Sequence, residues 1–253
     1  MAFIPQNDLE QSLLRASTAP ECRPQFYRDL LKSDLFVVQD GPPPLDAGKS
    51  VLESGMKLRI MPIEWEGRPY LPVFSSPLRL QAVLTHEASY LGLNAAVLMK
   101  ITKGADLLLN FGSECGKVLE KGEIAALLSG EMFEPAARVI KEDTNVLLGE
   151  PARYPAALVE ALAAYFKTIP EVEKAYLAHI LDPSEAQKGH TLIALQVKGD
   201  WDKVRAGVGP VISGIEIPDP PVDMMRITGQ GGLEDYFTQS AKPFYRRKRF
   251  GFF

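Results

Sequence analysis

The sequence predicts an α+β protein of two mixed α/β domains, the second with the ferredoxin-like element order βαββαβ. The first observation is the length, because 253 residues suffice for two domains of ordinary size. The second is the stretch over 106–130, where an apolar strand, a glycine-flanked turn, a short strand and a helix with a stop glycine close one α/β unit. The third is a charged segment over 135–143, which we interpret as a linker between domains at 1–135 and 143–253.

In the first domain, apolar periodicity and turn residues predict the elements in order. Leu9, Leu13 and Ala16 give the first helix an apolar stripe, and Ser76-Pro77 combines an N-cap residue with proline at the first helical position. Consecutive prolines over 42–44 predict a loop rather than a central strand. We expect helices over 7–17, 20–32, 76–84, 94–99 and 123–128, strands over 34–39, 56–65, 70–74 and 105–111, and a loop over 41–55.

The second domain alternates apolar strands with two helices. That order predicts an antiparallel sheet with both helices on one face. A short helical turn over 233–237 and an aromatic-basic tail follow. We expect strands over 144–148, 172–181, 191–198 and 224–228, and helices over 155–168 and 201–212.

Composition and charge argue against several classes of protein. Apolar residues make up 46% and charged residues 24% of the chain, as in soluble globular proteins. The net charge of −4 argues against a general affinity for nucleic acid or acidic membranes. No apolar run reaches the roughly 18 residues that span a bilayer, no secretory signal is visible, and two cysteines cannot form a disulfide framework. We therefore expect a cytoplasmic protein without a membrane span.

The turn over 112–116 is the first candidate site. Its backbone N–H groups could hold an anion or another small ligand, but the phosphate-loop spacing Gly-x4-Gly-Lys is absent and Glu114 would repel a phosphate. Cys115 would need a nearby histidine or helix N-terminus to act as a nucleophile, and no histidine is close in sequence. We expect a turn cysteine in a glycine loop that closes the sheet. The candidate ligand-binding residues are Asn110, Gly112, Ser113, Gly116 and Lys117.

Metal and acid–base sites have weaker support. His179 and His190 flank a predicted hairpin and could approach each other across strands, but two imidazoles alone make a poor zinc site. Paired carboxylates such as Glu171 and Glu173 are expected on solvated strand edges. The loop over 229–232 lacks the strand–Gly-x-Gly-x-x-Gly–helix context of a dinucleotide fold. We therefore assign no catalytic residue, no metal ligand and no cofactor.

The tail over 243–253 is the second candidate site, because four consecutive basic residues lie between aromatic residues in an otherwise acidic chain. It could contact an acidic partner, a membrane surface, or RNA through stacking and phosphate contacts. Alternatively, its aromatic rings dock on the second domain and leave the arginines in water. We expect at least Phe244 and Tyr245 to dock. The candidate partner-binding residues are Phe244, Tyr245, Arg246, Arg247 and Arg249.

Several of these motifs carry a family resemblance. They are Leu71-Pro-Val-Phe-Ser-Ser, Asp106-Leu-Leu-Leu-Asn-Phe-Gly-Ser-Glu-Cys-Gly-Lys-Val-Leu, Leu148-Gly-Glu-Pro and Pro243-Phe-Tyr. The first two resemble the N-terminal domain, and the last two the C-terminal domain, of the SseB family of enhanced serine sensitivity proteins. Phe111 departs from the proline that we expect in many relatives. The resemblance implies a two-domain fold over nearly the whole chain, a link to serine sensitivity in bacteria, and no established catalytic reaction.

Three functions are compatible with these observations. The first is a non-catalytic cytosolic regulatory or protein-interaction protein, which binds a protein partner or a second copy of itself through sheet edges and the tail. The second is a small-molecule sensor or enzyme of amino-acid (serine) metabolism, which predicts a concave site near the turn. The third is RNA binding through the basic residues over 246–249, which the acidic net charge disfavours. We expect the first.

Overall fold

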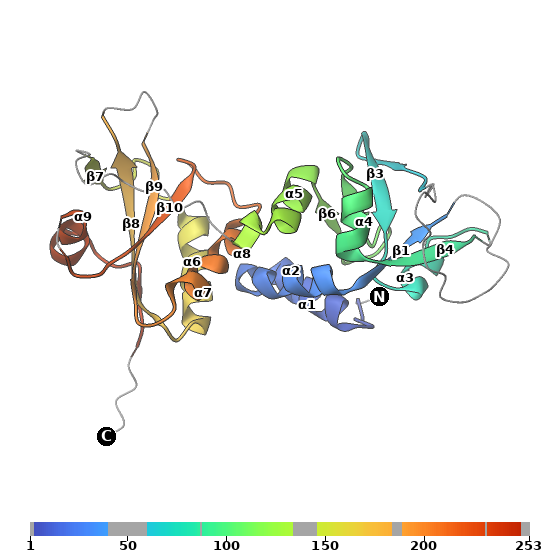
Figure 1. Ribbon diagram of the computed structural model, residues 1–253, viewed down its shortest axis with the longest axis horizontal. Helices are drawn as coiled ribbons and strands as arrows, with labels where there is room; N and C mark the ends of the chain where they lie inside the picture. Colours follow the sequence, from blue (N-terminus) through green and yellow to red (C-terminus); the bar gives the residue numbers. More distant parts are fainter. Residues whose placement is uncertain are drawn as a thin grey trace, which may run out of the picture. The chain divides into compact units, whose positions relative to one another are not determined.

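Figure 1 shows the computed structural model, which describes residues 3–39, 60–86, 88–133, 146–183, 189–230 and 232–248. Contacts divide the chain into two compact units, one of Met1–Thr18 with Gln25–Ser129 and the other of Ala19–Pro24 with Gly130–Phe253. An α+β protein of two domains is thus confirmed. The bounds 1–135 and 143–253 stay a prediction, because the expected linker lies outside the described residues, as does the expected loop over 41–55.

The first unit contains a four-stranded sheet in the order β2-β3-β5-β6 and a two-stranded ribbon of β1 and β4. In the sheet, β3 and β5 are parallel and the other pairs are antiparallel. The strands are β1 (Asp34–Val38), β2 (Ile63–Trp65), β3 (Arg68–Val73), β4 (Tyr90–Asn94), β5 (Leu107–Leu109) and β6 (Lys117–Leu119). The helices are α1 (Asp8–Thr18), α2 (Arg23–Lys32), α3 (Pro77–Gln81), α4 (Ala95–Ile101) and α5 (Lys121–Ser129).

Local sequence signals explain several of these boundaries. The Ser76 side chain accepts a hydrogen bond from the third residue of α3, and Pro77 occupies the first helical position, as predicted. Asn94 caps α4 in the same way. The two central residues of the β2–β3 hairpin turn are Glu66 and Gly67, with φ values of 50° and 75°. Turns with positive φ at both central residues have a backbone twist that matches the twist of the flanking strands. Both predicted helix starts are therefore confirmed, and the described part of the strand expected over 56–65 pairs with the strand expected over 70–74.

Strand β4 is absent from the sequence prediction. Its central residue is Gly92, and glycine normally weakens a strand because it has no side chain to pack. In the fold, the Phe36 ring of the partner strand lies over that glycine, where an added Cβ would be 2.9 Å from Phe36 Cε1. The contact that stabilises β4 thus comes from a residue far away in sequence.

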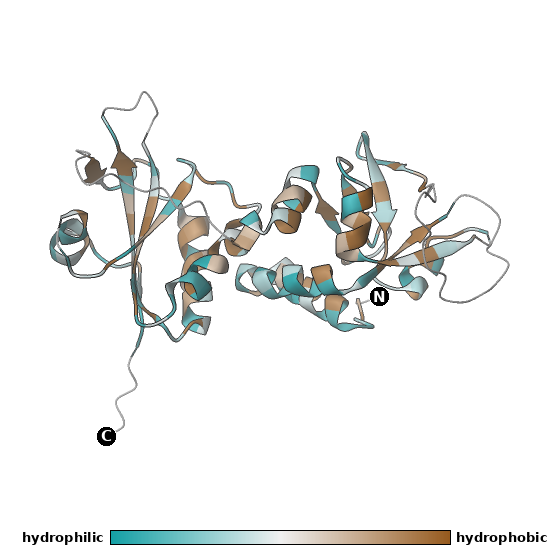
Figure 2. Ribbon diagram, in the orientation of Figure 1, coloured by the Kyte–Doolittle hydropathy of each residue, from teal (hydrophilic) through white to brown (hydrophobic). Residues whose placement is uncertain are grey.

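The second unit is one five-stranded sheet with helices on both faces. Strand β8 pairs with β9 along one edge, while β7 and β11 share its other edge, and β10 lies outside β9. Figure 2 shows hydrophobic residues along β8 and α6. The strands are β7 (Leu147–Gly149), β8 (Val172–Leu181), β9 (His190–Val197), β10 (Val222–Arg226) and β11 (Tyr245–Arg246). The helical segments of the chain not yet named are η1 (Pro20–Cys22), η2 (Glu131–Phe133), α6 (Ala156–Thr168), α7 (Trp201–Ala206), α8 (Val208–Ile212), α9 (Leu233–Asp235) and the π-helical η3 (Tyr236–Ser240).

Each face of this sheet has its own apolar cluster. On one face, α6, α7 and α8 pack through residues such as Phe166, Val204 and Val211. On the other face, Phe237 of η3 is fully buried among side chains of β8 and β9. The predicted helix over 201–212 is interrupted at Gly207, where the Tyr165 ring leaves no room for a Cβ.

The strand order does not confirm the ferredoxin-like detail. A split βαβ arrangement separates the two strands of each βαβ unit by another strand. Here β9 and β10, which α7 and α8 connect along the chain, are direct parallel neighbours. Likewise β7 and β8, which α6 connects, are direct antiparallel neighbours. The order βαββαβ is present, but the order of elements along the chain does not determine which strands pair.

Candidate functional site

The turn between β5 and β6 is tightly constrained by its backbone. Asn110 and Gly112 have positive φ values of 54° and 76°. An added Cβ at Gly116 would lie 2.8 Å from the Leu109 carbonyl oxygen, so only glycine fits there without a shift. The Ser113 N–H donates to the Asn110 carbonyl at 3.1 Å, which closes the turn. The two glycines are therefore explained by backbone geometry, as the sequence predicted.

A buried polar network lies beside this turn. Glu10 of α1 is fully buried, and its carboxylate accepts a forked pair of hydrogen bonds from Arg79 Nε at 3.2 Å and Nη2 at 2.8 Å. The Ser75 hydroxyl donates to Glu10 at 2.6 Å. Asn110 Oδ1 accepts from the Ser75 N–H at 2.9 Å. The network thus joins α1, the start of α3 and the turn after β5.

Glu10 should make the stability of the first unit depend on pH. Burial by itself raises the pKa of a carboxyl, but hydrogen bonds from Arg79, Ser75 and Gln6 outweigh it and hold the pKa of Glu10 below its ordinary value. Such a group stabilises the folded state above its unfolded pKa, and this contribution is lost as the pH falls through the folded pKa. We expect Glu10→Gln to remove part of the acid-induced loss of stability below the ordinary value of 4.5. Urea denaturation of the unaltered protein and the Glu10→Gln protein between about pH 3 and 6 measures this loss of stability. Identical dependence of stability on pH in the two proteins would contradict the prediction.

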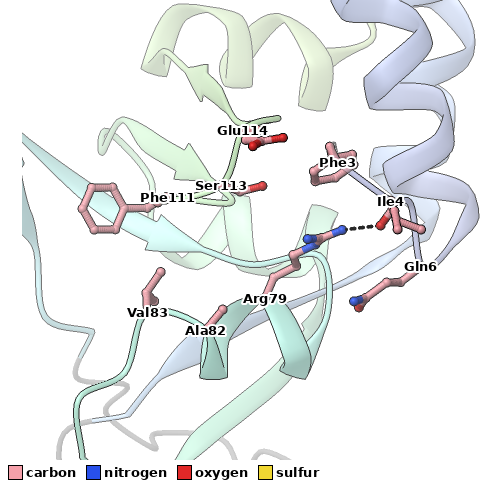
Figure 3. Close-up of a pocket in the computed structure, with 10 residues that line it drawn as sticks. Phe3, Ile4, Gln6, Arg79, Ala82, Val83, Phe111, Ser113 and Glu114 are labelled. Carbon is pink, nitrogen blue, oxygen red and sulfur yellow. Dashed lines mark hydrogen bonds between the residues drawn. The ribbon is translucent and has the colours of Figure 1, made fainter. Parts of the chain in front are cut away.

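A groove of about 520 Å³ opens along the same turn. Figure 3 shows Ser113 and Glu114 of the turn on one side, Arg79 and Ala82 on the other, and the N-terminal segment with Phe3 at one end. We call it the turn groove. Its lining residues are Phe3, Ile4, Gln6, Arg79, Ala82, Val83, Phe111, Gly112, Ser113 and Glu114.

Arg79 holds the N-terminal wall of the turn groove in place. Its Nη2 donates to the Ile4 carbonyl oxygen at 2.6 Å, and its guanidinium carbon lies 4.1 Å from the centre of the Phe3 ring. At the opposite end, Phe111 contacts the ring of Trp65 edge-on, with centroids 5.4 Å apart. The apolar surface of the groove therefore continues onto an exposed tryptophan of β2.

Both cations near the turn already have carboxylate partners. Arg79 pairs with Glu10 as described, and Lys117 Nζ is 3.0 Å from Glu123 Oε1. Lys117, one of the predicted ligand-binding residues, is thus held in an ion pair with a residue of α5. The exposed Glu114 adds a negative charge to the groove's rim. An anion in the turn would have to compete with Glu10 and Glu123 for these two cations.

Cys115 is buried beside this network. Burial raises the pKa of its thiol, the nearby Glu10 charge raises it further, and Arg79 opposes both only in part. A thiol with a raised pKa is a poor nucleophile at neutral pH. The expectation of a structural turn cysteine agrees with this environment.

The structure brings together only some of the predicted ligand-binding residues. Gly112 and Ser113 line the turn groove, and Asn110 belongs to the buried network. Gly116 is required by the backbone geometry of the turn. Lys117 forms the ion pair with Glu123. Sequence reasoning missed Glu10, Ser75 and Arg79. One signal was available, because Glu10 lies next to Leu9 and three residues before Leu13, on the buried stripe of the first helix.

The two strand histidines do not form a joint site. His179 is opposite Thr191, and His190 is opposite Ile180, across β8 and β9. Because successive side chains point to opposite faces of a sheet, the two imidazoles lie on opposite faces. His190 Nε2 instead lies 2.7 Å from Asp223 Oδ2. Across the described ranges, no group of three or more His, Cys, Asp and Glu residues could hold a metal ion.

The glycine-rich loop after β10 binds a carboxylate of the chain itself. Both oxygens of Glu234 accept from the Thr228 N–H at 2.9 Å, and the N–H groups of Gly229 and Gln230 also donate to Oε2. Burial raises the pKa of Glu234, but these hydrogen bonds outweigh it and lower the pKa overall. The loop therefore fixes α9 on the sheet and is not open to a phosphate.

The aromatic part of the tail is docked on the second unit. β11 pairs with β8, Tyr245 is buried, and its hydroxyl donates to the Phe166 carbonyl at 3.1 Å. Phe244 packs against the same core. Tyr245 is therefore a core residue rather than a partner contact, which corrects its place among the predicted binding residues. Arg246 and Arg247 are exposed. Arg249 lies outside the described residues.

Comparison with known proteins identifies the class of protein. Residues 9–126 match the SseB protein N-terminal domain, and residues 140–247 match the SseB protein C-terminal domain. The chain therefore belongs to the SseB family, as the resemblance predicted. It is similar to "Protein SseB" of Escherichia coli (strain K12), with 31% identity over 254 aligned positions that cover 98% of this chain and 95% of the relative. "Protein SseB" of Shigella flexneri matches with the same identity and coverage.

No solved structure matches the chain. Among the helices of the described ranges, none is long and apolar enough to cross a membrane.

Proposed function

We propose that this SseB-family chain is a non-catalytic regulatory protein of the cytoplasm that acts by binding another protein through the turn groove. The observation that carries the proposal is the exposed apolar surface of the groove. Ile4 is 75% exposed, and Trp65, which continues the groove through Phe111, is 42% exposed. An apolar patch rimmed by polar residues is typical of a protein-interaction site.

The environment of the polar groups supports a role without catalysis. The only cysteine at the turn has a buried thiol with a raised pKa, and the two nearby cations are held in ion pairs. These groups stabilise the groove's walls, whereas a catalytic group would need access to a substrate. Both cysteines, Cys22 and Cys115, are unpaired, which supports a reducing compartment such as the cytoplasm.

The test is affinity capture with the tagged full-length chain from an extract of the organism that makes it. We expect one or more proteins that bind the unaltered chain to be lost with Val83→Asp, which places a charge in the groove. Val97→Asp on α4 is the matched control, because Val97 is an exposed valine of the same unit that does not line the groove. Thermal melts of both variants verify folding. Equal capture by all three proteins would contradict the proposal.

A small-molecule sensor of serine metabolism is the second candidate. The groove's volume of about 520 Å³ lies within the roughly 300–1,000 Å³ of small-molecule sites. The link to serine comes from the family resemblance alone. A rise in melting temperature with L-serine, lost with Val83→Asp and kept with Val97→Asp, would favour this candidate over protein binding.

A further inference from the structure

Two cations lie directly opposite each other in the sheet of the second unit. Arg246 of β11 is the register partner of Lys174 of β8. The Arg247 N–H donates to the Glu173 carbonyl at 2.9 Å, so the backbone hydrogen bonds flank this pair and do not join its two members. At such a position of an antiparallel sheet the Cα atoms are about 4.5 Å apart and the side chains are closest. Arg246 and Lys174 therefore extend from the same face at short range.

No carboxylate of the described ranges neutralises this pair. Among the residues that the structure describes, neither the Arg246 nor the Lys174 side chain forms an ion pair or a hydrogen bond. Glu173, the carboxylate next to Lys174 in the sequence, lies 2.8 Å from Lys198 Nζ. Like charges directly opposite each other destabilise an antiparallel sheet. The folded unit thus contains a repulsive contact that a bound anion would relieve.

A neutral amide extends the pair into a row across three strands. Gln196 of β9 is the register partner of Lys174 on its other side, so its side chain extends from the same face. We call Arg246, Lys174 and Gln196 the basic row. Arg246 is exposed, and Lys174 and Gln196 are half-buried. The row carries three kinds of donor that a carboxylate accepts from, namely a guanidinium, an ammonium and an amide.

The aromatic residues of the tail distinguish among the classes of anionic partner. Single-stranded nucleic acid binds where cations accompany aromatic rings on which the bases stack. Of the tail's aromatic residues that the structure describes, Phe244 packs against the core and Tyr245 is buried, so neither ring is free to stack on a base. Binding to a membrane surface likewise uses exposed apolar side chains beside the cations. The row therefore favours an acidic protein segment, whose carboxylates need only cations and hydrogen-bond donors.

Further positive charge follows the basic row along the chain. Arg247 and Lys248 are exposed, and the four residues over 246–249 are all basic. The charge thus extends beyond the contact that one small anion makes. A segment with several carboxylates contacts more of these cations at once and gains affinity from each further contact.

We propose that the basic row binds an acidic segment of a partner protein, whose Asp or Glu carboxylates pair with Arg246 and Lys174. The row belongs to the second unit, whereas the turn groove belongs to the first. The proposal therefore goes beyond the proposed function, and either one can fail without the other.

Fluorescence anisotropy tests the proposal on the full-length chain, with a labelled peptide of alternating Glu and Ser at low salt. We expect Lys174→Glu and Arg246→Glu each to weaken peptide binding about tenfold. Lys103→Glu is the matched control, because it makes the same change of charge at an exposed lysine of the first unit. It should have little effect on binding. A peptide with Gln in place of each Glu should not bind.

Thermal melts separate loss of the site from loss of the fold. Lys174→Glu replaces a like-charge pair with an opposite-charge pair across β8 and β11, so the melting temperature should stay equal or rise while peptide binding falls. The double variant of Lys174→Glu and Arg246→Glu should instead bind a peptide of alternating Lys and Ser. If a charge reversal does not fold, Arg246→Gln at the exposed end of the row repeats the test.

Three results would overturn the proposal. The first is no binding of the Glu-Ser peptide at low salt. The second is equal weakening by Lys174→Glu and Lys103→Glu, which would assign the binding to net charge alone. The third is tighter binding of oligouridylate, or of vesicles that contain phosphatidylserine, than of the peptide, which would assign the row to nucleic acid or to a membrane.

Discussion

Replacing Glu10 with alanine is expected to lower the free energy of unfolding of the first unit by about 3 kcal/mol. Removing one member of a buried ion pair leaves the other without its partner. Here the Gln6 N–H also loses its acceptor, and the Ser75 hydroxyl keeps only Asn110 Oδ1. The Arg79 side chain is 18% exposed, so water can solvate part of its charge. We therefore place the loss of unfolding free energy at the lower end of the range for broken buried ion pairs.

Urea denaturation of the full-length chain measures this loss. A Trp201→Phe background leaves Trp65 as the single tryptophan, so that fluorescence follows the first unit. Glu64→Ala is the control, because Glu64 is an exposed carboxylate of the same unit, and it should change stability by less than about 0.5 kcal/mol. A loss at Glu10 no larger than at Glu64 would show that the network does not stabilise the groove's walls.

Replacing Glu234 with alanine is expected to destabilise the second unit by about 2–3 kcal/mol. The backbone N–H groups of Thr228, Gly229 and Gln230 lose a common acceptor, and so does the Thr228 hydroxyl. These donors lie in a loop that water can reach after the substitution, which limits the penalty for each one. Glu234→Gln keeps one acceptor oxygen and should cost less than alanine.

The neighbouring residue provides the matched control. Asp235→Ala removes an exposed carboxylate from the same helical segment and should change stability by less than about 0.5 kcal/mol. In a Trp65→Phe background, the fluorescence of Trp201 follows the second unit during urea denaturation. Equal stabilities of the Glu234→Ala and Asp235→Ala proteins would contradict the role assigned to the carboxylate.

Features set by neighbouring residues were predictable from the sequence. The Ser76-Pro77 helix start, the Glu66-Gly67 hairpin and the bounds of β8 at Val172–Leu181 depend on local caps, turns and apolar runs. The docking of Tyr245 was predictable from its amphipathic side chain.

Features set by distant contacts were not predictable. β4 depends on the Phe36 ring over Gly92, and the order of strands in the second unit depends on which edges meet. In the candidate site, the turn with Gly112 and Ser113 could be found from its glycines. Glu10 and Arg79 could not be paired from sequence, because they lie on separate helices and meet only in the folded unit.

Photo-crosslinking tests the central claim most directly, because it reports which surface of the chain touches a partner. The photoreactive residue p-benzoyl-phenylalanine is placed at Val83 in the turn groove or at Val97 outside it, in the full-length chain made in its own organism. We predict a covalent adduct with a partner protein from position 83 and none from position 97. An absence of adducts at position 83, or the same adducts from both positions, would contradict the assignment of the groove as the binding site.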